Sequence, residues 1–324
     1  MITIGVMLLV VLVRAGMHQA VLAQSLADDS KVSEQTGSTS LGAGRVFRTR
    51  HYDIFTTCTN PQLIARLPDF MERAFDAYQS LLPTPVNSRY PARIYLFDGR
   101  DPWECFTRSF AGDQAEVLLR IQQGAYCLKD ACVAYDIGVT RTLAALAHEG
   151  WHQFACRYVQ DRLPSWLDEG LAMQFESLAV TTPGHAFDPV ENPYRVQAMK
   201  QLLAQSQWCP LAEILAMSPG EVMASNQAAS VVSFYSQSYA LVRFLSQDRY
   251  ARDFQQLLWD GASGRWPLTP AYQRIAMDRN LPKTLTWNRR VGPELFKYYI
   301  GDDLDRLDRE YLRFCRAWVG LEPD

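Results

Sequence analysis

The sequence predicts an α+β fold, with a mixed α/β N-terminal lobe that contains a small sheet and a mainly helical C-terminal lobe. The runs that we predict to be strands, which are rich in β-branched and aromatic residues, all lie before residue 136. Beyond Ser177 the apolar residues mostly recur at the three- and four-residue spacing of amphipathic helices. A chain of 324 residues, 48% of them hydrophobic, is long enough to form the core of one large domain or of two lobes.

The N-terminus resembles a secretory signal peptide. Residues 2–13 are almost wholly apolar but too few to span a bilayer comfortably, and Val21 and Ala23 occupy positions −3 and −1 of a possible cleavage site. We therefore expect residues 1–23 to be removed and the protein to be exported, either periplasmic or secreted, without stable membrane insertion. An uncleaved membrane anchor is the alternative. Residues 24–45 are rich in Ser, Gly, Asp and Gln, which predicts a flexible linker.

The net charge and the cysteines restrict the possible partners and pairings. A net charge of −3 is too close to neutral to indicate binding to nucleic acid or to an anionic membrane surface. The seven cysteines are an odd number, so at least one thiol stays free or pairs between chains. Export would permit disulfides. Cys127 and Cys132 flank a plausible turn, Leu-Lys-Asp-Ala, and are the first candidates for a pair.

The N-terminal lobe is expected to span residues 46–178. Asn60 precedes Pro61 and an apolar pattern of helical spacing, which predicts an N-capped helix that ends before Pro83. The same reasoning predicts strands at 51–57, 92–97, 116–121 and 126–135, and helices at 61–82, 103–108 and 140–158, the last with Thr140 as its N-cap.

The C-terminal lobe is expected to span residues 179–324. Residues 179–192, with the sequence Thr-Thr-Pro-Gly near their start, predict a loop. Residues 261–292 contain several glycines and prolines and show no clear pattern. Helices are expected at 193–205, 211–217, 227–246, 250–259 and 302–318.

The helix predicted between the two lobes carries an H-E-x-x-H pattern, from His148 to His152. Positions i and i+4 lie on the same helix face, so the two imidazoles can point at one site. Two neutral imidazoles suit zinc, and Glu149 can accept a proton from a water molecule that the metal activates. An accidental match on an amphipathic helix is the alternative. Against it, two of only five histidines in the chain fall in this pattern.

A third candidate ligand lies on the next predicted helix, which begins just after Pro164. Glu169 completes a His/His/Glu set, an arrangement that leaves a fourth position for water in catalytic zinc sites. A carboxylate here also has a simpler explanation, because acidic side chains favour the first turn of a helix, and Asp168 could serve that role equally well. Cys156 is expected to be a buried small residue rather than a ligand.

The H-E-x-x-H pattern and the segment Trp166–Ala172 (WLDEGLA) together resemble the gluzincin metallopeptidases, especially the bacterial peptidase-MA-like family. The resemblance implies a gluzincin-like fold in which the zinc helix lies between the two lobes. It also implies that Zn²⁺ is held by His148, His152 and Glu169, and that Glu149 is the general base.

The segment Phe234–Val242 is similar to the downstream helix of that family and to the Y-x-K-G helix of zinc aminopeptidases. The tyrosine of that helix stabilises the oxyanion, and its position falls on Tyr235, with Tyr239 one turn away as the second candidate. Gln237 and Ser238 replace the Lys and Gly of the pattern. Either tyrosine could instead pack its ring in the core and leave its hydroxyl in water.

Other features limit the resemblance. The strand before the zinc helix should form the sheet edge that holds an extended substrate, yet Gly124–Cys127 lacks the Glu of the aminopeptidase G-x-M-E-N anchor. This argues against an aminopeptidase and leaves endopeptidase or another exopeptidase activity open. Met173 stands where some gluzincins have an Asp that orients a zinc histidine, so other residues must orient His148 and His152. His185 is a weaker oxyanion or substrate candidate, with a surface histidine as the alternative.

We therefore expect a zinc-dependent metallopeptidase that hydrolyses a peptide or protein substrate, with Glu149 as base and Tyr235 as a donor to the oxyanion. One alternative is an exported, non-catalytic binding protein of the gluzincin fold. The other is a zinc hydrolase that acts on a non-peptide amide, because a fold and a motif do not define the substrate.

Overall fold

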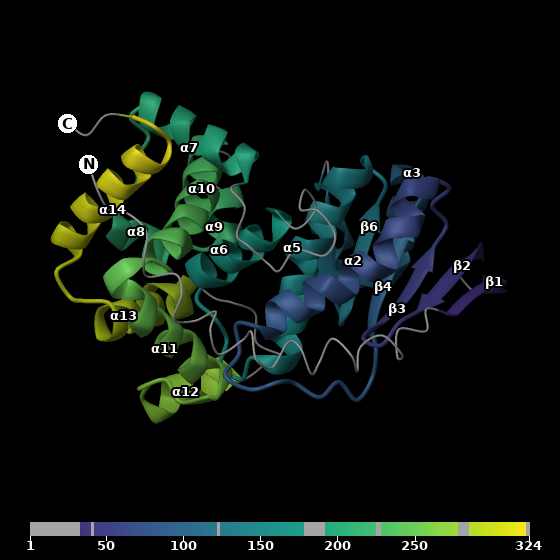
Figure 1. Ribbon diagram of the computed structural model, residues 1–324, viewed down its shortest axis with the longest axis horizontal. Helices are drawn as coiled ribbons and strands as arrows, with labels where there is room; N and C mark the ends of the chain where they lie inside the picture. Colours follow the sequence, from purple (N-terminus) through teal and green to yellow (C-terminus); the bar gives the residue numbers. More distant parts are fainter. Residues whose placement is uncertain are drawn as a thin grey trace, which may run out of the picture.

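The computed structural model describes residues 33–39, 42–121, 124–177, 192–224, 228–277 and 285–321. The fold is α+β, as predicted: a six-stranded mixed sheet is followed by a mainly helical second half (Figure 1). The expected signal peptide, residues 1–23, lies outside the described residues. No helix within the described ranges combines the length and the apolar character needed to cross a membrane.

The sheet has a parallel centre and antiparallel margins. Its strand order is β1-β2-β3-β4-β6-β5, so β5 forms one edge. The β3–β4 and β4–β6 pairs are parallel, and the other pairs are antiparallel. The strands are β1 (Ser33–Thr39), β2 (Gly42–Arg48), β3 (Tyr52–Thr56), β4 (Ala92–Phe97), β5 (Ala125–Leu128) and β6 (Ala131–Tyr135).

The expected linker at residues 24–45 is in part sheet. β1 pairs with β2 from Ser33 opposite Arg48 to Thr39 opposite Gly42, and β2 continues the sheet next to β3. The linker prediction is therefore wrong for this part. Strand β1 has the sequence SEQTGST and no apolar face, so only its backbone pairing with β2 makes it a strand.

Two strand predictions before the helix that carries His148 also need correction. Residues 115–118 form a short helix, α4 (Ala115–Leu118), where a strand was expected at 116–121. The guanidinium of Arg100 donates to the carbonyls of Leu119 and Ile121, 2.9 Å away in each case, and so holds the end of this helical turn.

The single strand expected at 126–135 is a hairpin formed by β5 and β6. Lys129 and Asp130 have φ angles of 49° and 61°, which is typical of the two-residue hairpin turns that need positive φ at both positions. Such turns usually contain Asn or Gly, so the Lys-Asp pair gave little sign of the chain reversal.

The predicted helices of the first half are present, with changed ends. They are α2 (Pro61–Gln79), α3 (Arg100–Ala111) and α5 (Val139–Tyr158). The Asn60 side chain caps α2 as predicted, by accepting hydrogen bonds from the amides of Gln62 and Leu63. Thr140 is not the N-cap of α5, because Gly138 at φ 97° turns the chain into the helix and α5 begins at Val139.

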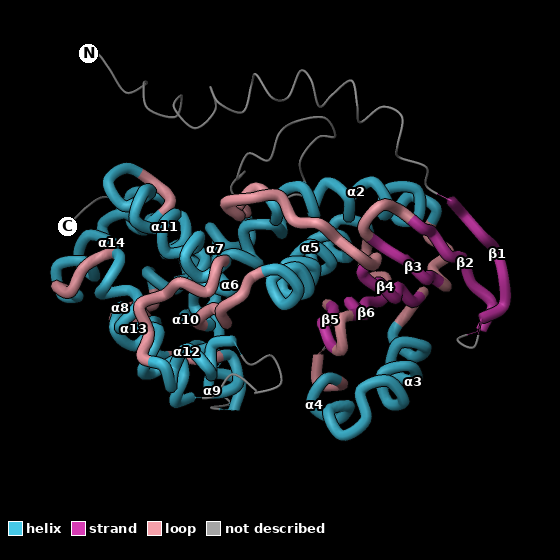
Figure 2. Tube along the Cα trace, turned by 90° about the horizontal axis from the view of Figure 1, so that it is seen from below, coloured by secondary structure: helices cyan, strands magenta, loops and turns pink. Residues whose placement is uncertain are grey.

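Helices cover both faces of the sheet. Figure 2 shows α2 and α5 on one side and α3 and α4 on the other. On the first side Ile54 and Ile94 of the sheet are buried in one core with Phe154 of α5. On the second side Trp103 of α3 packs in a smaller core with Val133. Helix α5 is thus fixed against the sheet by one face, which leaves another face toward the helical lobe.

The second half is mainly helical, as predicted, and the segment 261–292 that showed no clear pattern contains α12 (Pro270–Met277) and the start of α13 (Leu285–Tyr299). The other helices are α6 (Ser165–Phe175), α7 (Pro193–Ala204), α8 (Leu211–Ala216), α9 (Pro219–Ala224), α10 (Ala228–Leu245), α11 (Ala251–Ala262) and α14 (Leu304–Trp318). The five helices predicted beyond residue 192 are present, with ends within three residues of the predicted ones, and α9 was not predicted.

Helix α6 lies at the centre of the molecule. All eleven of its residues are buried, and it packs against α5 on one side and α10 on the other (Figure 1). Gly170 allows the approach to α10, because a Cβ at this position would lie 2.6 Å from the carbonyl oxygen of Ser238. The helix that carries Glu169 is therefore held on all sides.

Candidate metal centre

Helix α5 presents His148, Glu149 and His152 toward α6. Its position is set by Tyr78 of α2, whose hydroxyl donates to the carbonyl of Ala147 over 2.7 Å. A Cβ at Gly150 would lie 2.6 Å from that hydroxyl, so the residue after Glu149 must be small for α2 and α5 to approach this closely. Both histidines remain partly exposed, whereas the neighbouring Trp151 is buried.

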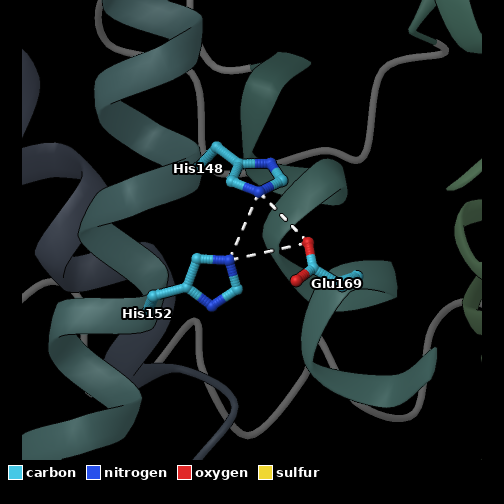
Figure 3. Close-up of side chains that lie close together, drawn as sticks. All are labelled: His148, His152 and Glu169. Carbon is cyan, nitrogen blue, oxygen red and sulfur yellow. Dashed lines mark hydrogen bonds and ion pairs between the residues drawn. The ribbon is translucent and has the colours of Figure 1, made fainter. Parts of the chain in front are cut away.

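The side chains of His148, His152 and Glu169 meet at one point (Figure 3). Glu169 Oε2 lies 3.4 Å from His148 Nε2 and 3.7 Å from His152 Nε2, and the two Nε2 atoms are 3.3 Å apart. Within the described ranges, no other cluster of His, Cys, Asp or Glu has this compactness. The structure thus brings together the three ligands expected from the sequence.

The spacing of these donor atoms fits a tetrahedral zinc ion. Bonds of about 2.0–2.1 Å in tetrahedral geometry place neighbouring donor atoms about 3.3–3.4 Å apart. The three observed separations, 3.3, 3.4 and 3.7 Å, lie close to that value. Two imidazole nitrogens and one carboxylate oxygen also form a donor set that zinc accepts, with one position left for another ligand.

A carboxylate that the sequence reasoning missed orients His148. Its Nδ1 lies 3.1 Å from Glu176 Oε1, just beyond α6. Arg195 donates to both oxygens of Glu176, over 2.6 and 3.1 Å, and the Asn192 side-chain amide donates over 2.8 Å. A metal-binding histidine usually donates its other ring nitrogen to such an acceptor, which fixes its tautomer and orientation.

Asp168 orients the second histidine. His152 Nδ1 lies 3.3 Å from Asp168 Oδ1, and the indole of Trp151 donates to the same oxygen over 3.0 Å. The sequence alone suggested only a helix-start role for this residue. Met173, the position where the resemblance led us to look for an orienting Asp, is fully buried. The two orienting carboxylates therefore flank Glu169 in the chain, one residue before it and seven residues after it.

The electrostatic environment favours a cation between these side chains. Burial lowers the pKa of His148, but the carboxylates of Glu169 and Glu176 outweigh it and raise the pKa to about 9. Burial likewise opposes the charge of His152, yet Asp168 and Glu169 raise its pKa well above the usual range. Burial alone would raise the pKa of Glu169, but the two histidines hold it well below its ordinary value.

Glu149 lies beside the three candidate ligands rather than among them. Burial raises the pKa of its carboxyl, partly opposed by the two histidines and by a hydrogen bond from the backbone amide of Cys127. Glu149, His152 and Glu169 line a cavity of about 400 Å³, which the edge strand β5 borders on the other side. A carboxyl whose pKa is raised in such a cavity can both accept and return a proton.

The two candidate tyrosines of α10 have different surroundings. Burial raises the pKa of the half-buried Tyr235, with further contributions from the charges of Glu169 and Glu149, so its hydroxyl lies within electrostatic reach of both carboxylates. Its hydroxyl has no hydrogen-bond partner in the described part of the chain. Tyr239 is buried, and its hydroxyl accepts a hydrogen bond from the Asn192 amide over 3.2 Å. Tyr239 therefore holds the start of α7.

The remaining candidates lie away from the ligands or outside the described residues. Cys156 is exposed, not buried as expected, because its side of α5 faces the cavity instead of the sheet. Gln237, which replaces the lysine of the aminopeptidase pattern, bonds both the amide and the carbonyl of Cys209 and so has a structural role. His185 falls outside the described residues.

A family model matches part of the chain. This model, described as a protein of unknown function (DUF1570), matches residues 142–269, which is less than half of the chain. This segment begins within α5 and ends after α11, so it contains all three candidate ligands, Glu149 and Tyr235, and excludes the sheet. The search of curated proteins found no match.

Proposed function

We propose that this protein is a zinc-dependent peptide hydrolase of the gluzincin type. The main support is the triangle of donor atoms from His148, His152 and Glu169, with a fourth side chain, Glu149, beside it. A structural zinc site does not require a carboxylate beside its ligands, whereas hydrolysis requires a base next to the attacking water. The carboxylates of Asp168 and Glu176 provide the orientation that the two histidines require.

A zinc ion bound by these three residues would supply Lewis-acid activation of a water molecule and of the scissile carbonyl. Glu149 accepts the proton of the attacking water and later passes it to the leaving amine. The backbone amide of Cys127 donates to Glu149 and limits the rotation of its carboxylate. Tyr235 donates a hydrogen bond to the oxyanion, a task that suits a hydroxyl without another partner among the described residues.

The edge strand β5 suits an extended substrate. Its outer side has no neighbouring strand within the described sheet, and it borders the cavity beside Glu149. A second cavity of about 360 Å³ is lined by Gly124, which precedes β5, and by Glu176 on the His148 side. A peptide that pairs with this edge through its backbone would therefore extend past the reacting residues in both directions, along the two cavities.

The decisive experiment compares Glu149→Gln with the wild type on a peptide library, with zinc content measured in both proteins. Loss of the base should reduce cleavage by about 10²-fold or more while zinc remains bound. Glu294→Gln is the matched control, because this glutamate is exposed and pairs with Lys297 at the surface. Full activity of Glu149→Gln at unchanged zinc content would overturn the proposed mechanism.

Two other results would point to different functions. Stoichiometric zinc without cleavage of any peptide would favour the non-catalytic binding protein. Cleavage confined to non-peptide amides, and still dependent on Glu149, would retain the chemistry and change the substrate class.

A further inference from the structure

Two cysteines face each other across the hairpin beside the candidate site. Cys127 of β5 and Cys132 of β6 are direct partners in the antiparallel register, next to the pair Leu128 and Ala131 that closes the two-residue turn. In such a hairpin the pair that closes the turn exchanges hydrogen bonds, and the next pair does not. Cys127 and Cys132 therefore occupy a non-hydrogen-bonded position, where the two Cα atoms are roughly 4.5 Å apart.

The two thiols also share one face of the hairpin. Direct cross-strand partners project to the same side of a sheet, and both cysteines pack toward α5. The Cys132 thiol is in hydrogen-bonding contact with that of Cys127 and lies 3.5 Å from the side-chain oxygen of Gln153. Both cysteines are free thiols in the structure. Their Cα separation falls within the range of roughly 4.4–6.8 Å that disulfides span.

We propose that Cys127 and Cys132 form a reversible cross-strand disulfide that fixes the edge strand β5 beside Glu149. Cys132 is completely buried, but Cys127 is half-buried and lines the 400 Å³ cavity, so one thiol of the pair can meet an oxidant from solvent. The Cys127 amide is also the backbone donor to Glu149. The link therefore restrains the residue that positions this carboxylate. The proposal does not depend on peptidase activity.

The reaction is an exchange with an external disulfide, of a small thiol or of a protein. Cys127 loses its proton and attacks one sulfur of the oxidant, which expels the other sulfur as a thiolate. Cys132 then attacks the Cys127 sulfur of this mixed disulfide and expels the second thiolate. The two protons released by the cysteines go to the two thiolates, so one disulfide forms in the protein and one is reduced in the oxidant.

The chain allows a direct test, because Lys129 separates the two cysteines. Trypsin cuts after Arg120, Lys129 and Arg141, which places Cys127 in peptide 121–129 and Cys132 in peptide 130–141. The full-length protein is equilibrated with glutathione disulfide, unfolded in acid, alkylated with N-ethylmaleimide and digested. We expect these peptides to stay joined until reduction, and the joined pair to weigh about 2 Da less than the two separate peptides together.

Control variants separate this pair from other thiols in the same cavity. Cys127→Ser and Cys132→Ala should each abolish the joined peptides. If one of these variants does not fold, the other still tests the proposal. Cys156→Ser is the matched control, because Cys156 is exposed and lines the same cavity, and it should leave the joined peptides unchanged. Alkylation of Cys127 and Cys132 after oxidation, or linkage of Cys127 to Cys156, would overturn the proposal. None of these outcomes requires catalysis.

Discussion

At the scale of single residues, the candidate centre depends on carboxylates with distinct tasks. Glu169 completes the ligand triangle, and Glu149 lies beside it as the proposed base. Asp168 and Glu176 each hold the distal nitrogen of one histidine. Glu176 keeps a pKa of about 2 because Arg195 and His148 together outweigh the effect of its burial. It therefore stays ionised and accepts from His148 throughout the neutral range.

Glu176→Gln should weaken zinc binding by about 10–100-fold, because His148 loses an ionised acceptor and Arg195 loses its partner. Competition between the purified protein and a chromogenic chelator measures the affinity. The matched control is Glu116→Gln, since Glu116 is highly exposed and belongs to α4, on the opposite side of the sheet from α5 (Figure 2). Equal affinities in wild type and Glu176→Gln would show that Glu176 does not orient His148.

Tyr235→Phe should lower kcat by about 10²–10³-fold with little change in KM, if Tyr235 donates to the oxyanion. The proper comparison is Tyr239→Phe, which removes the acceptor of the buried Asn192 amide. That change should cost about 1–3 kcal/mol of unfolding free energy and affect kcat less. Steady-state kinetics and urea unfolding of both variants distinguish the two roles. A larger loss of kcat in Tyr239→Phe would reverse the assignment.

At the scale of helices, the site requires two close approaches, of α6 to α10 and of α5 to α2. Glu169 is followed by Gly170, where α6 approaches the backbone of α10 at Ser238. On α5, Gly150 allows the corresponding approach to Tyr78. Each glycine is adjacent to a proposed functional residue, Glu169 or Glu149, so the absence of a Cβ permits the close packing of the helix that presents the functional group.

Gly170→Ala should lower the free energy of unfolding by about 1–3 kcal/mol, because the added Cβ would lie 2.6 Å from both Ser238 O and Val242 Cγ2. Gly220→Ala in α9 is the control with the opposite sign. A Cβ at Gly220 would have no other atom within 4 Å, so helix propensity should leave stability unchanged or raise it by up to about 1 kcal/mol. Urea denaturation measures both, and equal effects would contradict the packing argument.

At the scale of the whole molecule, the candidate centre joins the sheet to the helical half. The two histidines come from α5, which packs on the sheet, and Glu169 comes from α6, which packs on α10. Arg195 of α7 extends the connection through Glu176. A metal ion bound here ties together parts of the chain that unfolding would separate, so it should stabilise the folded state.

Removal of zinc with a chelator should therefore lower the midpoint of thermal unfolding, and added zinc should restore it. Free zinc at 100 times its Kd corresponds to about 2.7 kcal/mol of stabilisation. Differential scanning calorimetry of the wild type and of Glu169→Gln measures the effect. The variant should respond much less to chelator because one ligand is lost. An identical response in both proteins would place the bound zinc elsewhere.

The sequence by itself determined the features that depend on short-range spacing. The i, i+4 histidines, the helix that carries Glu169, the Asn60 cap and the β4 strand follow from local patterns, because helix and strand periodicities and caps involve residues within one or two turns. The α+β class follows from the order of those patterns along the chain.

Only the tertiary structure decided the contacts between distant segments. Glu176 contacts His148, which lies 28 residues earlier in the sequence, and Arg195 of α7 donates to Glu176. Strand β1 forms because it pairs with β2, and the guanidinium of Arg100 donates to the carbonyl of Leu119 at the end of α4. In each case, backbone pairing or a side chain brought near by folding provides the stabilising partner, so no local pattern of residues could reveal it.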